Sequence, residues 1–151
     1  MLSRTRSAAP PLEDRIFVTL LKVADIFALE SEQFLKSVGL TGAQYNVLRI
    51  LRGAEPEGLP CRGIGDRMIS HDPDITRLLD RMEKRGLITR ERQTDDRRVV
   101  KTRITPEGLA ILKPLDEPVH ALHRQQFQHM PASRLKALGE LLDEVLAREE
   151  K

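Results

Sequence analysis

The chain has few of the residue types on which several classes of protein depend. Among its 151 residues there is one cysteine, Cys61, no tryptophan, and only 3% aromatic residues. A single cysteine excludes an intrachain disulfide, and with it a disulfide-stabilised extracellular scaffold. No apolar run approaches the roughly 18 residues that a membrane span needs, and residues 1–12 lack the apolar stretch of a secretory signal. We therefore expect a cytoplasmic protein that has no membrane partner.

Positive charge is concentrated in one part of the chain. The net charge of the whole chain is only +2. Residues 77–103 contain ten basic and five acidic residues, a net charge of +5 that leaves −3 for the rest of the chain. A charged run is often no more than a solvated face. When it coincides with a DNA-binding motif, it is typical of a surface that attracts nucleic acid.

An amphipathic helix begins this basic segment. Asp72 and Pro73 are typical of a helix start, because the carboxylate accepts from free backbone N–H groups and proline has no N–H to satisfy. Gly86 is typical of a helix end. The spacing of four apolar residues predicts one buried face, formed by Ile75, Leu78, Leu79 and Met82. The other face carries Asp74, Arg77, Arg81 and Lys84.

A β-hairpin with a charged tip is predicted after this helix. Residues 87–92 and 99–104 are rich in strand-forming side chains, and residues 93–98 between them are polar or charged. A basic helix followed by such a hairpin predicts a winged helix-turn-helix. In that motif the helix enters the major groove of DNA and the hairpin, or wing, enters an adjacent minor groove. The expected fold is mainly α-helical with a small β-hairpin wing.

Local signals predict the elements around this motif. Thr41 and Gln44 have the pattern of a capping box, which predicts a helix that ends at Gly53. Residues 54–59 are expected to form a loop and residues 61–69 a short helix. Two glycines in that helix are expected to permit close packing against the next one: Gly63 and Gly65. Another helix is predicted to start at residues 105–108, and two prolines are expected to kink or interrupt it: Pro114 and Pro118.

Both ends of the chain are predicted to contain long helices. We expect a flexible arm over residues 1–12, a winged helix-turn-helix domain over residues 40–106, and dimerisation helices over residues 13–38 and 107–149. Apolar residues recur at three- and four-residue spacing in both flanking segments, more of them than one small domain needs, which favours a homodimer. The alternative is a helical core within one subunit. The expected interface residues are Ile16, Leu20, Leu115, Val119, Leu135, Leu138, Leu142 and Val145.

The order of these elements resembles the multiple-antibiotic-resistance regulator (MarR) family over nearly the whole chain. The most specific stretches are residues 75–88, and residues 95–98 followed by residues 104–108. The resemblance implies a homodimeric transcriptional regulator, usually a repressor, that binds a palindromic operator. It also implies release from DNA by a small organic ligand, often aromatic or phenolic. In the wing signature of the family, Asp96 holds the wing and Arg98 enters the minor groove, with Arg97 beside it.

The expected DNA contacts lie on the predicted recognition helix, in the turn before it and on the wing. They are His71, Asp74, Thr76, Arg77, Arg81, Arg97 and Arg98. For Arg77 the alternative is a surface ion pair with Asp80 or Glu83, and Arg81 is equally compatible with bracing the wing through Asp95 or Asp96.

Two other classes of function are disfavoured. An RNA-binding module is disfavoured by the lack of aromatic stacking residues on the predicted strands. An enzyme is disfavoured because the sequence has no nucleophile elbow and no phosphate-binding glycine loop. His120 and His123 have a spacing that suits zinc, but no third ligand accompanies them, so we expect neither a metal site nor a cofactor.

Overall fold

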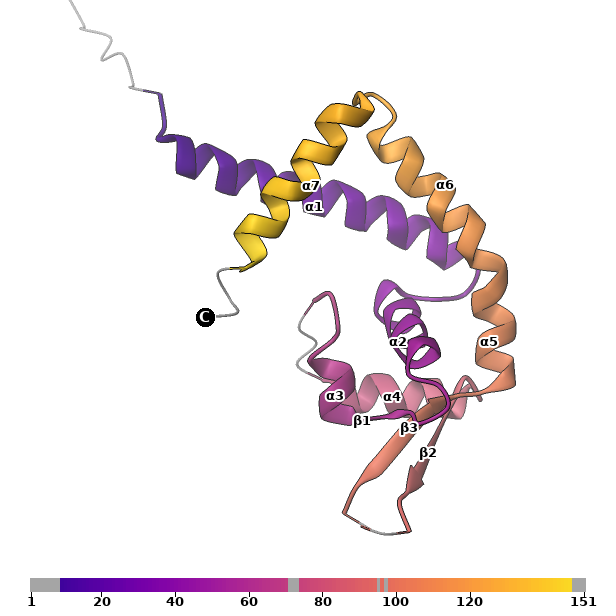
Figure 1. Cartoon of the computed structure of the whole chain (residues 1–151). Helices are drawn as coiled ribbons and strands as arrows, with labels where there is room; N and C mark the ends of the chain where they lie inside the picture. The colour runs from indigo at the N-terminus through magenta and orange to yellow at the C-terminus, as the bar shows by residue number, and fades with distance from the viewer. Residues whose placement is uncertain (1–8, 71–73, 95, 97, 148–151) are drawn as a thin grey trace, which may run out of the picture. The chain divides into compact units, whose positions relative to one another are not determined.

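The computed structural model describes residues 9–70, 74–94, 96 and 98–147, and the chain divides into two compact units, residues 1–45 and 46–151 (Figure 1). The helices are α1 (Leu12–Ser37), α2 (Gly42–Gly53), α3 (Cys61–Gly65), α4 (Ile75–Lys84), α5 (Pro106–Leu112), the 3-10 helix η1 (Lys113–Leu115), α6 (Asp116–Phe127) and α7 (Ala132–Leu146). The strands are β1 (Leu59–Pro60), β2 (Ile88–Arg92) and β3 (Val100–Ile104). The fold is mainly helical with a small antiparallel sheet, as the sequence predicted.

The first unit contains α1 and the first turn of α2. Gly39 adopts a φ of 74°, a conformation that favours glycine, and the chain leaves α1 there. The capping box is confirmed, because the Gln44 N–H donates to the Thr41 hydroxyl and the Thr41 N–H donates to the Gln44 side chain, both at 3.1 Å. Leu35 is the one residue of α1 that is buried. Almost the whole of this 26-residue helix is therefore exposed in the single chain.

The sheet of the second unit has three strands in the order β1-β3-β2, all antiparallel. The loop expected at residues 54–59 was wrong at its end, because Leu59 and Pro60 pair with β3. Gly58, with a φ of 69°, brings the backbone so close to β3 that a Cβ atom would lie 2.5 Å from the Thr102 carbonyl oxygen. The Arg103 Nε atom also donates to the Pro56 carbonyl at 2.9 Å, which holds the segment before β1 against the sheet.

The short helix α3 and the recognition helix α4 depart from the predicted boundaries. The helix expected over residues 61–69 ends at Gly65, and the helix expected from Asp72 begins at Ile75. Asp72 lies outside the described residues, and the N-cap of α4 is Asp74, whose carboxylate accepts from the Arg77 N–H at 3.4 Å. A Cβ atom at Gly65 would lie 3.6 Å from the Ile75 side chain, an ordinary contact. Glycine is therefore not required for the close packing that the sequence suggested.

The apolar face predicted for α4 lies in the core of the second unit. Leu78, Leu79 and Met82 are at most 2% exposed, while Ile75 is half-buried. α4 packs beside β2 and α3. Other core residues of this unit are Val47, Leu48, Leu51, Ile64, Leu87, Ile88, Ile104 and Leu112.

The wing leads directly into α5 through a threonine cap. The Thr105 hydroxyl accepts from the Gly108 N–H at 3.0 Å and donates to the Gly86 carbonyl at 2.6 Å, so one side chain joins the end of α4 to the start of α5. The predicted interruption at Pro114 is confirmed as the 3-10 helix η1. Pro118 lies in the first turn of α6, where the missing N–H leaves no helical hydrogen bond unmade.

An ion pair fixes the start of α6 to the last turn of α2. The Arg52 guanidinium donates to both carboxylate oxygens of Asp116, each at 2.9 Å. These hydrogen bonds lower the pKa of Asp116 below its ordinary value, although partial burial opposes the shift. The pair is a bidentate one, the geometry in which arginine holds a carboxylate most firmly.

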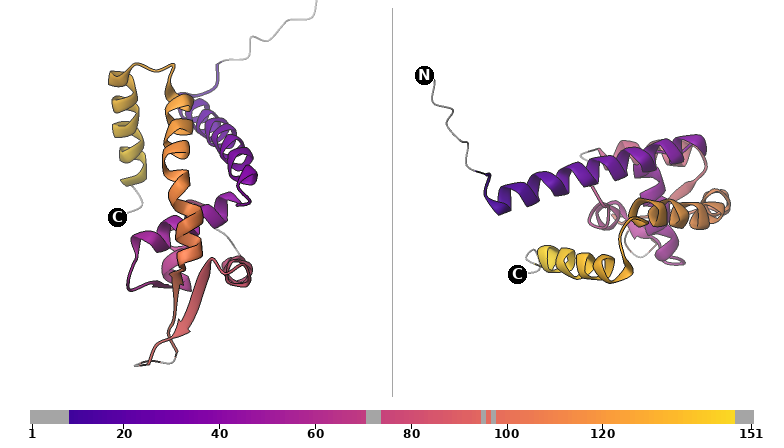
Figure 2. Two further views of the ribbon diagram at one scale, coloured as in Figure 1. Left: turned by 90° about the vertical axis from the view of Figure 1, so that its right-hand side faces the viewer. Right: turned by 90° about the horizontal axis from the view of Figure 1, so that it is seen from above.

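Two residues of the predicted dimer interface are covered by the chain itself. Leu115 and Val119 are each 5% exposed, so they belong to the core of the single chain and are not available to a partner. α7 turns back from α6 at residues 128–131 and has no buried residue (Figures 1 and 2). Leu138 is half-buried, whereas three other predicted interface residues of α7 are exposed: Leu135, Leu142 and Val145.

The close approach of α5 to the end of α4 predicts a requirement for glycine at position 108. A Cβ atom there would collide with the Leu87 carbonyl oxygen and lie 2.8 Å from the Ile104 side chain. We expect Gly108→Ala to lower the free energy of unfolding by about 1–3 kcal/mol in urea denaturation. Gly139→Ala is the control, because a Cβ atom there meets nothing within 4 Å, and alanine should raise helix stability by up to about 1 kcal/mol. Equal stability of the two variants would contradict the steric argument.

Candidate nucleic-acid interface

α4 exposes the polar residues that the sequence assigned to DNA contact on this helix. The Arg77 side chain is 79% exposed, and Thr76 and Arg81 are exposed as well. The Arg77 Nε atom lies 3.2 Å from the Asp74 carboxylate, so Asp74 both caps the helix and pairs with Arg77. The partner differs from Asp80 and Glu83, the two alternatives that the sequence suggested. An exposed pair of this kind contributes about 0–1 kcal/mol, so Arg77 is readily released to another anion.

Asp80 and Glu83 instead hold an arginine of the wing. The Arg90 Nη2 atom lies 2.6 Å from both carboxylates, and Arg90 Nε donates to Glu83 at 3.0 Å. We call these three residues the Arg90 clamp. Its hydrogen bonds, that to Glu83 first, raise the pKa of Arg90 above its ordinary value against the opposing effect of burial. The clamp joins two acidic residues of α4 to β2 and so holds the wing against the recognition helix.

The role of Arg90 was missed in the sequence, where it was counted with the basic residues of the DNA-binding segment. A signal was present. Residues two apart in a strand face the same side, and Ile88 is buried, so Arg90 lies on the side of β2 that faces α4.

A second arginine of the wing is also engaged within the protein. The Arg103 Nη1 atom on β3 lies 3.1 Å from the Glu91 carboxylate on β2. Arg90 and Arg103 therefore stabilise the wing and contribute less to the outer surface. Basic residues of the segment that remain exposed in the described part of the chain are Arg77, Arg81, Lys84, Arg85, Arg92 and Arg98.

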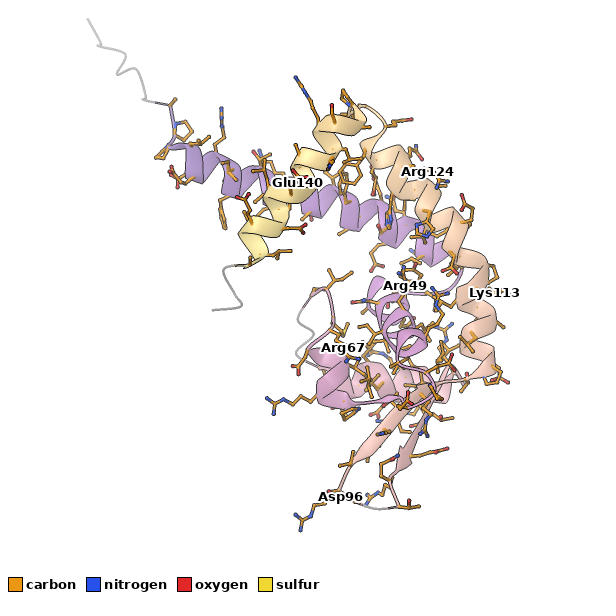
Figure 3. All side chains as sticks on the ribbon, in the orientation of Figure 1. Arg49, Arg67, Asp96, Lys113, Arg124 and Glu140 are labelled. Carbon is orange, nitrogen blue, oxygen red and sulfur yellow. The ribbon has the colours of Figure 1, made fainter. Side chains whose placement is uncertain are left out.

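The wing tip is organised by Asp96, which Figure 3 shows at the far end of the hairpin. Its carboxylate accepts from the Arg98 N–H at 2.9 Å, and its carbonyl accepts from the Val99 N–H at 3.0 Å. The Gln93 N–H closes the hairpin on the Val99 carbonyl at 3.0 Å. Asp96 thus fixes the backbone that carries Arg98. Arg97 and Asp95 lie outside the described residues.

The turn between α3 and α4 is tied to α2. The Ile69 N–H donates to the Asn46 side-chain carbonyl at 2.8 Å. This contact was not predicted, and it holds the turn from which the chain enters the recognition helix. His71, which was expected to contact DNA, lies outside the described residues.

The described residues offer neither a metal-binding group nor a membrane-spanning helix. Those residues contain no group of three or more histidine, cysteine, aspartate or glutamate side chains that could hold a metal ion. His120 and His123 are exposed on α6. Among the helices of the same residues, none is long and apolar enough to cross a membrane.

A helix with exposed arginines, fixed to a wing by a second set of charges, defines a winged helix-turn-helix of the DNA-binding kind. The model of the MarR family matches residues 40–100, which cover this motif as far as the first residue of β3. A MarR transcription factor from Planctomyces limnophilus has a similar structure, with a TM-score of 0.68 and 38% identity over 90% of this chain and 98% of that one. This chain belongs to the MarR family, whose members are DNA-binding transcription regulators and not enzymes.

Two further relatives extend the comparison. The homoprotocatechuate degradative operon repressor of Escherichia coli is 26% identical over 136 residues, which cover 90% of each chain. The structure of the S. aureus MepR–DNA complex is similar in fold alone, with a TM-score of 0.78 at 17% identity over 87% of this chain and 96% of that one.

The Arg90 clamp predicts an energetic coupling between α4 and β2. Because its side chains are a quarter to nearly a half exposed, solvent screening limits the coupling. We expect about 1 kcal/mol between Arg90 and Glu83 in a double-mutant cycle of Arg90→Ala and Glu83→Ala, measured by urea denaturation. Arg92→Ala, on the same strand and exposed, is the control and should change stability by less than about 0.5 kcal/mol. Additive effects of the Arg90 and Glu83 substitutions would show that the clamp is not coupled.

Proposed function

We propose that this chain is a transcriptional repressor that binds a palindromic operator as a homodimer and releases it on binding a small organic ligand. The observation that carries the proposal is the division of the basic residues within the family's DNA-binding motif. Arg90 and Arg103 hold the wing in place, while Arg77 on α4 and Arg98 on the wing are exposed beside groups that fix their backbone. Such an arrangement presents two positive elements to adjacent grooves of one duplex.

Support for DNA as the partner comes from the motif and from a relative. The S. aureus structure is that of MepR in complex with DNA, and this chain has a similar fold. DNA placed against α4 would meet Arg77 and Thr76 first, because both are exposed in the N-terminal half of the helix. Regulation of transcription from DNA agrees with the expected cytoplasmic location.

Support for a homodimer comes from apolar residues that one chain leaves uncovered on α1 and α7. α1 exposes Leu12, Ile16, Phe17, Val18, Leu20, Leu21, Val23, Ile26 and Leu29. α7 exposes Leu135, Leu141, Leu142, Val145 and Leu146. Apolar surface of this extent, on two helices, is typical of an interface between subunits. A two-fold dimer would present two recognition helices, and the operator would then be palindromic.

The class of ligand is supported by a relative and by the family. The name of the Escherichia coli relative assigns it to an operon for the degradation of homoprotocatechuate, an aromatic acid. By this likeness we expect the effector to be a small aromatic acid or a phenol.

The ligand class is tested by adding such compounds to the protein–operator complex and measuring release of the DNA, with zinc and peroxide in parallel. Release by zinc or peroxide alone would contradict the proposal of an organic effector.

The dimer proposal predicts that a charge on the apolar side of α7 separates the subunits. Leu142→Glu should convert the dimer to monomer in sedimentation velocity, because a carboxylate replaces an apolar contact, and should abolish operator binding with it. Ser133→Glu is the matched control: nine residues at about 100° each place it on the opposite side of the same helix, and it should remain dimeric. A Leu142→Glu chain that stays dimeric, or that binds its operator fully as a folded monomer, would contradict this interface.

The DNA proposal is tested by selecting duplexes from a random pool and measuring the affinity of variants for the selected site. Arg77→Ala should cost about 1–3 kcal/mol on that site and relax preference at one position per half-site, if Arg77 pairs with a guanine.

Arg98→Ala should weaken binding to most sequences and reduce the slope of log affinity against log salt by about one per subunit. Asp96→Ala should reproduce part of this loss although it removes a negative charge, because Asp96 holds the backbone of Arg98. Tighter binding by Asp96→Ala would contradict the wing assignment, and failure to select any duplex would contradict the function.

A further inference from the structure

Ile69 stands apart from the other apolar residues of the second unit. It is 90% exposed, the largest exposed fraction among the large apolar side chains of the described residues. Among the described residues between 46 and 131, the next most exposed large apolar residue is Val100 on the wing, at 36%. The remaining exposed large apolar residues of the described chain lie in its first 38 residues and on α7.

The exposure of Ile69 is built into the backbone. Its N–H donates to the Asn46 side chain at 2.8 Å, and the Met68 N–H before it donates to the Gly65 carbonyl at 3.2 Å. The Ile69 N–H thus ties the backbone to α2, and the Met68 N–H ties it to the end of α3. A fixed backbone holds the side chain in solvent, where an apolar group of this size gains nothing for stability.

The position of Ile69 indicates what it meets. The residue lies between α3 and α4, five residues before the N-cap of the recognition helix. In a helix-turn-helix, the start of the recognition helix and the turn before it approach the major groove. The apolar group that DNA presents in that groove is the C5-methyl of thymine.

The neighbouring charges favour DNA over a protein partner. Arg67, which is labelled in Figure 3, lies two residues before Ile69 and is exposed, as is Arg77 on α4. A single isoleucine is also far smaller than the apolar patch of a few hundred Å² that marks a protein interface. Exposed arginines before and after an apolar residue in the sequence suit a surface that meets both phosphates and a thymine methyl group.

We propose that Ile69 contacts a thymine C5-methyl in each half-site and so determines sequence preference there. The inference rests on the proposed function, because it needs an operator bound through α4. Asn46 is the positioning residue: it fixes the turn and does not itself touch the base.

The experiment removes the methyl group from the DNA and the side chain from the protein separately. The probe is the duplex selected with the full-length protein, remade with deoxyuridine in place of one thymine at a time. Deoxyuridine pairs like thymine but lacks the C5-methyl. At one thymine per half-site, the replacement should weaken the unaltered protein about fourfold, the effect expected from exposing one methyl group. The same replacement should change the affinity of Ile69→Ala less than twofold, with Ile69→Val between the two.

Two further measurements separate this role from a structural one. Ile69→Ala should retain the thermal midpoint and the oligomeric state of the unaltered protein, because a side chain that is 90% exposed contributes no packing. Asn46→Ala should lose part of the preference for thymine over deoxyuridine, while Asn46→Asp, which keeps the acceptor for the Ile69 N–H, should retain it.

Two results would overturn the contact between Ile69 and thymine, and a third would overturn the role of Asn46. If deoxyuridine at every thymine has the same effect on Ile69→Ala as on the unaltered protein, Ile69 lies away from the base. If Ile69→Ala shifts the dimer equilibrium, the side chain lies in a contact between subunits. Equal thymine preference in Asn46→Ala and the unaltered protein removes the positioning role. If the unaltered protein selects no duplex, the proposed function itself is contradicted. The other results contradict only the role of Ile69 or of Asn46, so the two kinds of failure are distinguishable.

Discussion

In the second unit, the Arg90 clamp sets the wing against the recognition helix, in addition to the apolar core that α4 and β2 share. One guanidinium bridges two carboxylates of α4 at 2.6 Å, and it comes from the strand that begins the wing. β2 is thereby fixed, and β3 follows through five paired positions from Ile88–Ile104 to Arg92–Val100. The wing tip and Thr105 lie at the two ends of β3, so the position of Arg98 and the start of α5 both follow from this ion pair and the ladder beside it.

The elements that the sequence predicted well depend on local interactions. The apolar side of α4 follows from spacing within ten residues, and the caps at Thr41 and Thr105 are made with residues three positions along the chain. Interactions over such short separations are encoded in the residues themselves. The boundaries of α4 were less accurate, because Asp72 and Asp74 are equally good caps in sequence and the structure places the N-cap at Asp74.

The features that were missed depend on contacts between different helices and strands. β1 has only two residues, and it forms because Gly58 lets the backbone approach β3, some forty residues away. Arg90 was indistinguishable in composition from the arginines of a DNA-binding surface until β2 was placed beside α4. Leu115 and Val119 continued the apolar stripe assigned to a dimer, but the single chain buries them. Periodicity identifies an apolar face and does not identify the surface that covers it.

Because α7 has no buried residue, its order would depend on protein concentration if a second subunit covers it as proposed. A helix of 15 residues is only marginally stable in water by itself, so this one needs a surface to lie against. When a second subunit supplies that surface, the helix content and the subunit equilibrium are linked by mass action. Dilution then loosens the end of the chain before the core built around α4 is affected. The amount of protein in a cell would thus set the fraction of molecules with an ordered C-terminal helix, apart from any ligand.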